Sequence, residues 1–143
     1  MKNELRFILA SHGPFARAAL ETLEMIAGKQ SNMTALELQF GEGLEEFVGK
    51  YEAEIAQYPE DTIIILTDIF GGTPSNAALQ LLFNHENIQV FSGFNIPLVL
   101  ELSTMSFENV ADLCAFAEKN WPNYLTNINQ QMQKREEVIE DEY

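Results

Sequence analysis

The sequence is poor in cysteine and in basic residues. A single Cys among 143 residues excludes an intramolecular disulfide and any zinc or iron–sulfur site built on several cysteines. Lys and Arg number 8 against 22 Asp and Glu, and residues 51–118 contain neither basic type. Nucleic acid binding needs clustered positive charge and is therefore disfavoured. The formal net charge of −14 instead favours encounter with a basic protein partner.

Long hydrophobic runs are also missing. The longest candidates, Ile63–Leu66 and Ile96–Leu100, are far shorter than the roughly 20 apolar residues that span a bilayer. The first six residues carry charges where a signal peptide needs its apolar region. A soluble cytoplasmic protein is therefore expected, and its length predicts a single domain.

Short apolar runs alternate along the chain with segments of helical periodicity. Strands are predicted at 5–10, 34–40, 62–67 and 88–91. Helices are predicted at 14–27, 44–55, 76–83, briefly after Pro97, and at 106–121. This order predicts an α/β fold, a three-layer, open, mostly parallel sheet of order 2-1-3-4 with helices on both faces. The domain is expected over 1–130, followed by an acidic C-terminal tail over 131–143 that frays in solvent at 136–142.

Two residues able to do chemistry follow the central strands of this sheet. His12 ends the first strand and Asp68 follows the third. Open parallel sheets bind ligands beyond the carboxyl ends of their strands, where the strand order reverses, so the two side chains are expected to meet. The carboxylate would accept a hydrogen bond from one ring nitrogen and leave the other unprotonated, as a nucleophile or base must be. Each residue alone fits a helix cap or a turn, but their coincidence favours a site.

The neighbouring residues suit a phosphoryl group. A helix N-terminus begins at Pro14, consecutive glycines let the backbone approach an anion, and hydroxyl groups can donate to it. These loops contain no Lys or Arg, which favours reversible transfer over tight, permanent binding. The expected phosphoryl-binding residues are Gly13, Gly71, Gly72, Thr73 and Ser75.

The remaining candidates are interpreted as structural. His85, in a polar turn, is expected at the surface, and Cys114, on an apolar helix face, is expected in core packing. The two His residues lack the spacing of metal ligands, and neither a metal nor an organic cofactor is expected. The G-x-S-x-G elbow is missing, which disfavours a Ser-His-Asp hydrolase that uses Ser11 or Ser75.

Three segments together resemble the IIA domain of the mannose-family sugar phosphotransferase system. They are Ser11-His12-Gly13, the string LTDIFGGTPSNAA over Leu66–Ala78, and GFNIP over Gly93–Pro97. The resemblance covers roughly residues 5–120 in order and spacing, and the glycine-rich string is its most specific part.

The resemblance implies a phosphohistidine carrier. In that family the histidine, here His12, accepts a phosphoryl group from the phosphocarrier protein HPr and passes it to the IIB component. IIB then phosphorylates the sugar as the membrane IIC and IID components import it. The resemblance also implies phosphorylation at Nε2, with Asp68 holding Nδ1–H and with Thr73 and backbone amides contacting the phosphoryl group. Apolar contact beside the site is expected from Phe70, Ile96 and Pro97.

The resemblance further implies a homodimer in which a C-terminal strand pairs with the neighbouring subunit's sheet. Residues 124–130 are the candidate strand, although their pattern fits a helix equally well. Some family members fuse IIA to IIB through an Ala/Pro-rich linker. The acidic C-terminus here predicts a stand-alone IIA polypeptide instead.

Two other functions remain open on the sequence. One is a related carrier that serves a dihydroxyacetone kinase and would also be phosphorylated at His12. The intact GGTPSNAA string favours the sugar system over that carrier. The other is a non-catalytic regulatory module of the same fold, which the presence of both His12 and Asp68 disfavours.

Overall fold

The computed structural model describes residues 4–141 and confirms the α/β architecture predicted from the sequence. Four strands form one parallel sheet in the order β2-β1-β3-β4, so the chain reverses its direction of winding between β1 and β3. The strands are β1 (Leu5–His12), β2 (Met33–Leu38), β3 (Thr62–Thr67) and β4 (Ile88–Ser92).

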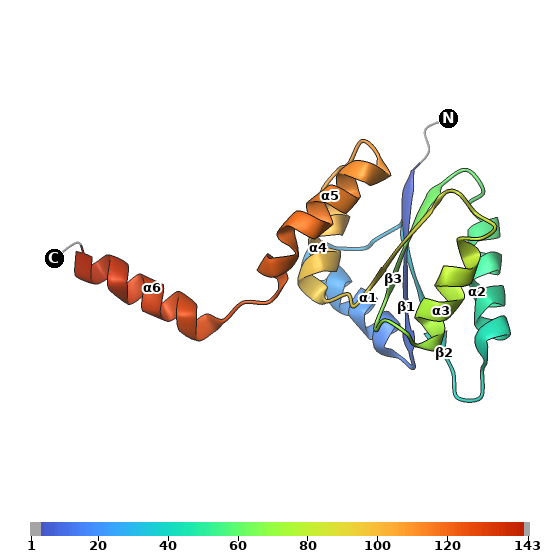
Figure 1. The fold of residues 1–143 in the computed structure, drawn as a ribbon, viewed down its shortest axis with the longest axis horizontal. Helices are drawn as coiled ribbons and strands as arrows, with labels where there is room; N and C mark the ends of the chain where they lie inside the picture. The colour runs from blue at the N-terminus through green and yellow to red at the C-terminus, as the bar shows by residue number, and fades with distance from the viewer. Residues whose placement is uncertain (1–3, 142–143) are drawn as a thin grey trace.

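Helices cover both faces of this sheet. α1, α4 and α5 pack on one face, while α2 and α3 pack on the other (Figure 1). The five helices are α1 (Phe15–Ala27), α2 (Leu44–Ala56), α3 (Thr73–Leu81), α4 (Ile96–Thr104) and α5 (Val110–Asn120).

The alternation of side chains along the central strands divides the core into two layers. In β1, Phe7 and Leu9 face α1 and α4, whereas Ile8 and Ala10 face α2 and α3. β3 lies in register, with Phe7 paired to Ile64, and is buried from Ile63 onward. A strand that is apolar on both faces is stable only between two helical layers, as the sequence predicted for 62–67.

α3 begins earlier than its apolar periodicity predicted, at Thr73 rather than at Asn76. Gly72 is extended at the N-cap, and Pro74 lies in the first turn, where a missing N–H costs no helical hydrogen bond. Thr73 and Ser75 therefore belong to a helix N-terminus and not to the loop that precedes it.

The C-terminal segment contains helices and not the candidate strand at 124–130, for which its pattern had left both alternatives open. Tyr124 ends a short 3-10 helix, η1 (Trp121–Tyr124), and α6 (Ile128–Asp141) follows after a short link. The segment after Ile128 is rich in Gln, Met, Lys, Arg and Glu, all good helix formers, which explains a helix in place of a strand. The predicted domain boundary at 130 falls inside α6, and the predicted frayed segment is helical as far as Asp141, its last residue lying outside the described part of the chain.

α6 extends away from the sheet and its covering helices (Figure 1). Within residues 4–141 no helix has the length and apolar character that crossing a membrane requires. The same part of the chain contains no group of three or more His, Cys, Asp or Glu side chains placed to hold a metal ion.

Candidate functional site

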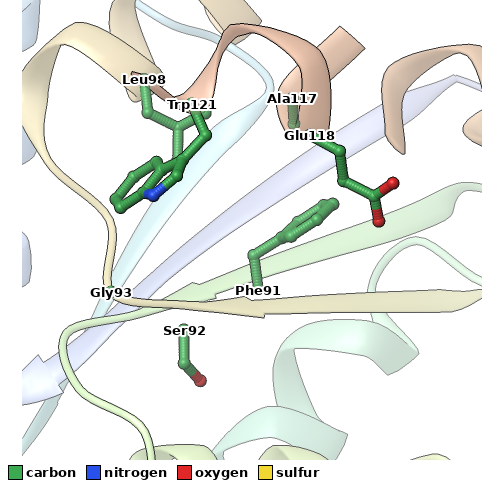
Figure 2. Close-up of a pocket in the computed structure, with 7 residues that line it drawn as sticks. All are labelled: Phe91, Ser92, Gly93, Leu98, Ala117, Glu118 and Trp121. Carbon is green, nitrogen blue, oxygen red and sulfur yellow. The ribbon is translucent and has the colours of Figure 1, made fainter. Parts of the chain in front are cut away.

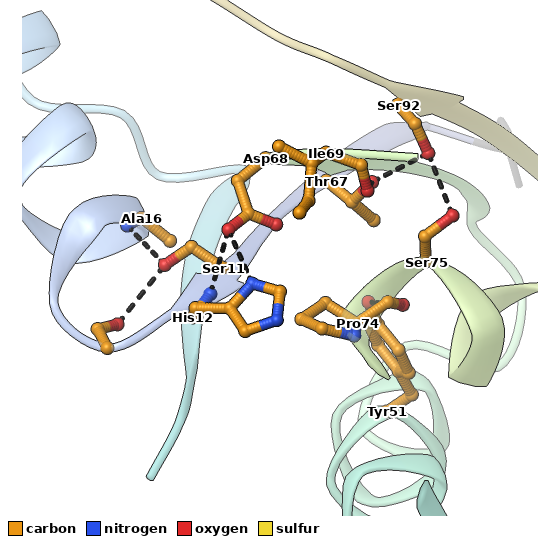
Figure 3. Close-up of polar contacts among 11 residues, drawn as sticks. Ser11, His12, Ala16, Tyr51, Thr67, Asp68, Ile69, Pro74, Ser75 and Ser92 are labelled. Atoms are coloured by element: carbon orange, nitrogen blue, oxygen red, sulfur yellow. Dashed lines mark hydrogen bonds and ion pairs between the residues drawn. The ribbon is translucent and has the colours of Figure 1, made fainter. Parts of the chain in front are cut away.

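His12 and Asp68 meet at the carboxyl end of the sheet, as the topology predicted. The Nδ1 atom of His12 lies 2.8 Å from the Oδ2 atom of Asp68, and the backbone N–H of His12 donates to the same oxygen at 3.0 Å (Figure 3). A carboxylate only accepts hydrogen bonds, so in the neutral imidazole Nδ1 carries the proton and Nε2 keeps a free lone pair. The His12 side chain is 46% exposed, whereas that of Asp68 is only 13% exposed.

One carboxylate oxygen of Asp68 accepts two hydrogen bonds, both from His12. Its Oδ2 accepts from both the ring and the backbone of His12, while its buried Oδ1 has no hydrogen-bond partner within residues 4–141. The backbone N–H of Asp68 donates to the carbonyl of Ala10 at 3.1 Å, which continues the pairing of β1 with β3 beyond the strand end. The carboxylate is thus held by the sheet itself in front of the imidazole.

Ser11 points to α1 and away from the imidazole. Its buried Oγ accepts from the N–H of Ala16 at 2.7 Å and donates to the carbonyl of Gly13 at 3.1 Å (Figure 3). The Ser11 hydroxyl therefore engages the N–H of Ala16 in the first turn of α1 from the end of β1, while Pro14 occupies the N-cap position. This geometry provides no Ser-His-Asp arrangement through Ser11.

Gly13 also serves the backbone. Its φ of +54° lets the chain turn from β1 into α1, and its N–H donates to the carbonyl of Leu38 on β2 at 2.9 Å. Gly13 was predicted to bind the phosphoryl group, but its N–H already donates to the neighbouring strand.

The imidazole packs against the N-terminus of α3. A Cβ atom placed on Gly72 would lie 2.6 Å from Cε1 and 3.1 Å from Nε2 of His12, so only glycine fits there without displacing the ring. The preceding Gly71 has a φ of +87°, a conformation that glycine adopts without strain. The first N–H groups of a helix have no partner inside it, and Thr73 and Ser75 carry such groups, whereas Pro74 has none. The backbone therefore presents donors and a partial positive charge close to Nε2.

The Ser75 hydroxyl is turned toward β4 instead. Its Oγ lies 3.0 Å from the Oγ of Ser92, which in turn accepts from the Thr67 hydroxyl at 2.7 Å (Figure 3). Ser75 is buried, so its hydroxyl joins α3 to the ends of β3 and β4. This hydroxyl was predicted to bind the phosphoryl group, whereas in the structure it contacts Ser92, a residue that the sequence marks only by its position just after the fourth predicted strand.

The family model for the PTS system fructose IIA component, where PTS denotes the sugar phosphotransferase system, matches residues 6–119. The chain belongs to this family. The fructose-specific EIIA component of Bacillus subtilis is 34% identical over 99 residues, which cover 68% of each chain. The mannose-specific EIIAB component of Escherichia coli is 33% identical over 98 residues, which cover 68% of this chain but 30% of that longer protein.

Solved structures extend the match to nearly the whole chain. The PTS IIA protein associated with the fucose utilization operon of Streptococcus pneumoniae has a TM-score of 0.77 and 33% identity, and the match covers 92% of this chain and 98% of that one. The protein is therefore a PTS IIA component of the mannose, fructose and sorbose family, a class of phosphotransferase carriers in sugar transport. These matches favour the sugar system over the dihydroxyacetone kinase alternative.

Exposed apolar side chains lie in the loops at the same end of the sheet as His12 and Asp68. Phe70 is 89% exposed, Ile69 and Phe15 are about half exposed, and Phe40 is fully exposed. Phe40 was predicted inside a strand, but β2 ends at Leu38, which pairs with His12, so Phe40 lies in the loop at the same end of the sheet. Of the other predicted contact residues, Pro97 is exposed and Ile96 is partly buried against the core.

His85 and Cys114, the other two side chains considered as candidates on the sequence, make no contact with the His12–Asp68 pair. His85 was predicted at the surface, but its Nε2 lies 3.0 Å from both carboxylate oxygens of Glu52 and its side chain is 23% exposed. It therefore joins α2 to the turn after α3. Cys114 is only partly buried on α5, and burial together with the charge of Glu118 raises the pKa of its thiol.

An apolar pocket of about 260 Å³ lies between β4 and the α4–α5 layer (Figure 2). Phe91, Leu98 and Trp121 form its main apolar walls, and none of the His12-site residues lines it. The His12 side chain lies outside this pocket and is 46% exposed.

Proposed function

We propose that the protein carries a phosphoryl group on Nε2 of His12, accepting it from phosphorylated HPr and delivering it to a IIB component in the cytoplasm. The observation that supports this most is the orientation of the imidazole. Asp68 occupies Nδ1, which leaves the lone pair of Nε2 free, half-exposed and next to the α3 N-terminus.

The transfer is an in-line exchange between two imidazoles. The Nε2 lone pair of His12 attacks the phosphorus, the bond between phosphorus and the donor's ring nitrogen breaks, and its electron pair returns to that nitrogen. As the new bond forms, positive charge develops on the His12 ring, and the Asp68 carboxylate 2.8 Å from Nδ1 stabilises it. Reversal of these steps delivers the group to IIB, so the protein contributes positioning and charge stabilisation.

The N-terminus of α3 is the binding site for the phosphoryl oxygens in this proposal. The N–H groups of Thr73 and Ser75 and the hydroxyl of Thr73 donate to them, aided by the positive end of the helix dipole. Gly71 and Gly72 allow the backbone to approach the anion. The Ser75 hydroxyl and the Gly13 N–H have no part in this binding, because Ser92 and Leu38 already engage them.

The partners dock on the exposed apolar ring around His12, formed by Phe15, Phe40, Ile69 and Phe70. Aromatic and aliphatic side chains that are exposed at a reactive residue are typical of transient protein interfaces. The net charge of −14 accelerates the approach of a donor with a basic surface.

The protein is proposed to form a homodimer through α6 in place of the predicted strand. α6 exposes the apolar side chains of Ile128, Met132, Val138 and Ile139. Helices that expose apolar residues at such spacing bury them against a partner. A second copy of the chain supplies an identical helix, which satisfies the symmetry of a two-fold dimer.

The decisive experiment is an intact-mass measurement. Wild type and His12→Ala are incubated with phosphoenolpyruvate, enzyme I and HPr. A gain of one acid-labile phosphoryl group in wild type alone is the expected result. If HPr becomes phosphorylated and wild type gains no mass, HPr is not the donor; a gain that persists in His12→Ala places the phosphoryl group on another residue.

A further inference from the structure

Tyr51 connects α2 to the first turn of α3. Its phenol O–H donates to the carbonyl of Pro74 at 2.8 Å (Figure 3). The Tyr51 side chain is fully buried and packs edge-on against Phe47, with ring centroids 4.9 Å apart. Packing thus fixes the direction of the hydroxyl, and the sequence pattern only placed Tyr51 on the buried face of its helix.

The turn that Tyr51 holds is the one that faces His12. Gly72 immediately precedes this turn, and its backbone packs so closely on the imidazole that an added Cβ would lie 3.1 Å from Nε2. A shift of α3 by a fraction of an ångström would therefore change which donors surround Nε2. A misplacement of about 1 Å can slow an enzymatic reaction about 100-fold.

A second restraint holds the same turn from the opposite side. The Ser75 hydroxyl bonds to Ser92 on β4, so α3 is held between α2 and the edge of the sheet. The Asn76 side chain also donates to the carbonyl of Gly71 at 3.2 Å, which steadies the loop before the helix. Among these contacts, only the bond from Tyr51 lies wholly within the core.

We propose that Tyr51 is a positioning residue for phosphoryl transfer, which sets the N-terminal turn of α3 at the distance from His12 that the phosphoryl group requires. This inference rests on the proposed role of His12. Burial and the nearby charge of Asp68 both raise the pKa of the Tyr51 phenol. The phenol therefore stays a neutral hydrogen-bond donor and does not act as an acid or base.

The test compares Tyr51→Phe with Tyr124→Phe. Tyr124 is also buried, and its hydroxyl donates to the Glu101 carboxylate at 2.9 Å, far along the chain from α3. Each variant loses the one hydrogen bond that its phenol O–H donates, so both are expected to be somewhat less stable than wild type. Only Tyr51→Phe should lower the kcat of phosphoryl transfer from phospho-HPr, by about tenfold, with KM unchanged. Equal kcat values in the two variants would make Tyr51 a merely structural residue.

A spectroscopic measurement separates this inference from the proposed partner. The proteins are phosphorylated chemically with phosphoramidate, and the amide protons of Thr73 and Ser75 are followed by NMR. A hydrogen bond to the phosphoryl group should move both amides downfield in wild type and in Tyr124→Phe, and less in Tyr51→Phe. If phospho-HPr fails as a donor but these shifts differ as stated, the positioning role stands and the proposed partner is wrong. Identical shifts in all three proteins would overturn the positioning role.

Discussion

The backbone of Gly72 lies so close to the His12 imidazole that the ring has no room for a methyl group there. Replacing Gly72 by Ala should push the imidazole away from α3 and disturb its hydrogen bond to Asp68. We expect the transfer rate of Gly72→Ala to fall at least about tenfold while the fold is retained, measured by stopped-flow or quench-flow with phospho-HPr.

Gly49→Ala is the matched control for that substitution. Gly49 lies within α2, where an added Cβ would meet no atom within 4 Å. Ala is the better helix former by roughly 1 kcal/mol, so this variant should be slightly more stable and fully active. A Gly72→Ala protein as active as Gly49→Ala would contradict the close packing of the ring.

Asp68→Ala should fold and transfer the phosphoryl group poorly. Without the carboxylate, Nδ1 loses the acceptor that holds its proton, and the ring loses the charge that stabilises it in the transition state. Loss of such an orienting partner typically costs about 10- to 100-fold in activity. Asp61→Ala removes a carboxylate that pairs with Arg6 near the opposite end of the strands, and it should retain the wild-type rate. Undiminished transfer in Asp68→Ala would refute the assigned role.

Transfer from phospho-HPr should slow as salt is added. With a net charge of −14, the protein attracts a basic partner over distances that depend on the Debye length, which shrinks from about 10 Å at 0.1 M to about 3 Å at 1 M salt. The second-order rate constant for transfer from phospho-HPr measures this effect. Phosphorylation by the small donor phosphoramidate, which needs no protein docking, serves as the reference. A rate constant independent of ionic strength would remove the electrostatic part of the docking argument.

Phe70→Ser should weaken docking without weakening the fold. Phe70 is 89% exposed in the loop that follows Asp68, so its removal should raise the KM for phospho-HPr several-fold at nearly constant stability. Phe83 is equally useful as a control because it is 83% exposed in the turn after α3, near the other end of the sheet. Phe83→Ser should therefore keep the wild-type KM, and equal KM values for the two variants would exclude an apolar docking ring.

Charge on the apolar face of α6 should convert the proposed dimer into a monomer. The double variant Ile128→Glu, Met132→Glu places two carboxylates one helical turn apart on exposed apolar positions. The control, Asn129→Glu with Gln133→Glu, adds the same charge at polar positions of the same helix. Analytical ultracentrifugation should give half the wild-type mass for the first variant only. A monomeric wild type would show that α6 has another role.

The order of the four strands and of α1–α5, and the meeting of His12 with Asp68, could be predicted from the sequence alone. Apolar runs of strand length between amphipathic segments require a parallel sheet with two helical layers. In such a sheet the carboxyl ends of neighbouring strands share one edge, so residues 56 positions apart are brought together by topology and not by any local feature.

The hydrogen-bond partners of individual polar groups were decided by the tertiary structure. The Ser75 hydroxyl turns to Ser92, the Gly13 N–H bonds to Leu38, and the Tyr51 hydroxyl reaches Pro74, each through a neighbour from another element. Sequence patterns specify which face of a helix or strand is buried, but not which polar partner the packing of those elements brings within reach. Residues 124–130 stayed ambiguous between strand and helix on the sequence. A strand would need a neighbouring strand to pair with, whereas α6 forms its backbone hydrogen bonds within itself.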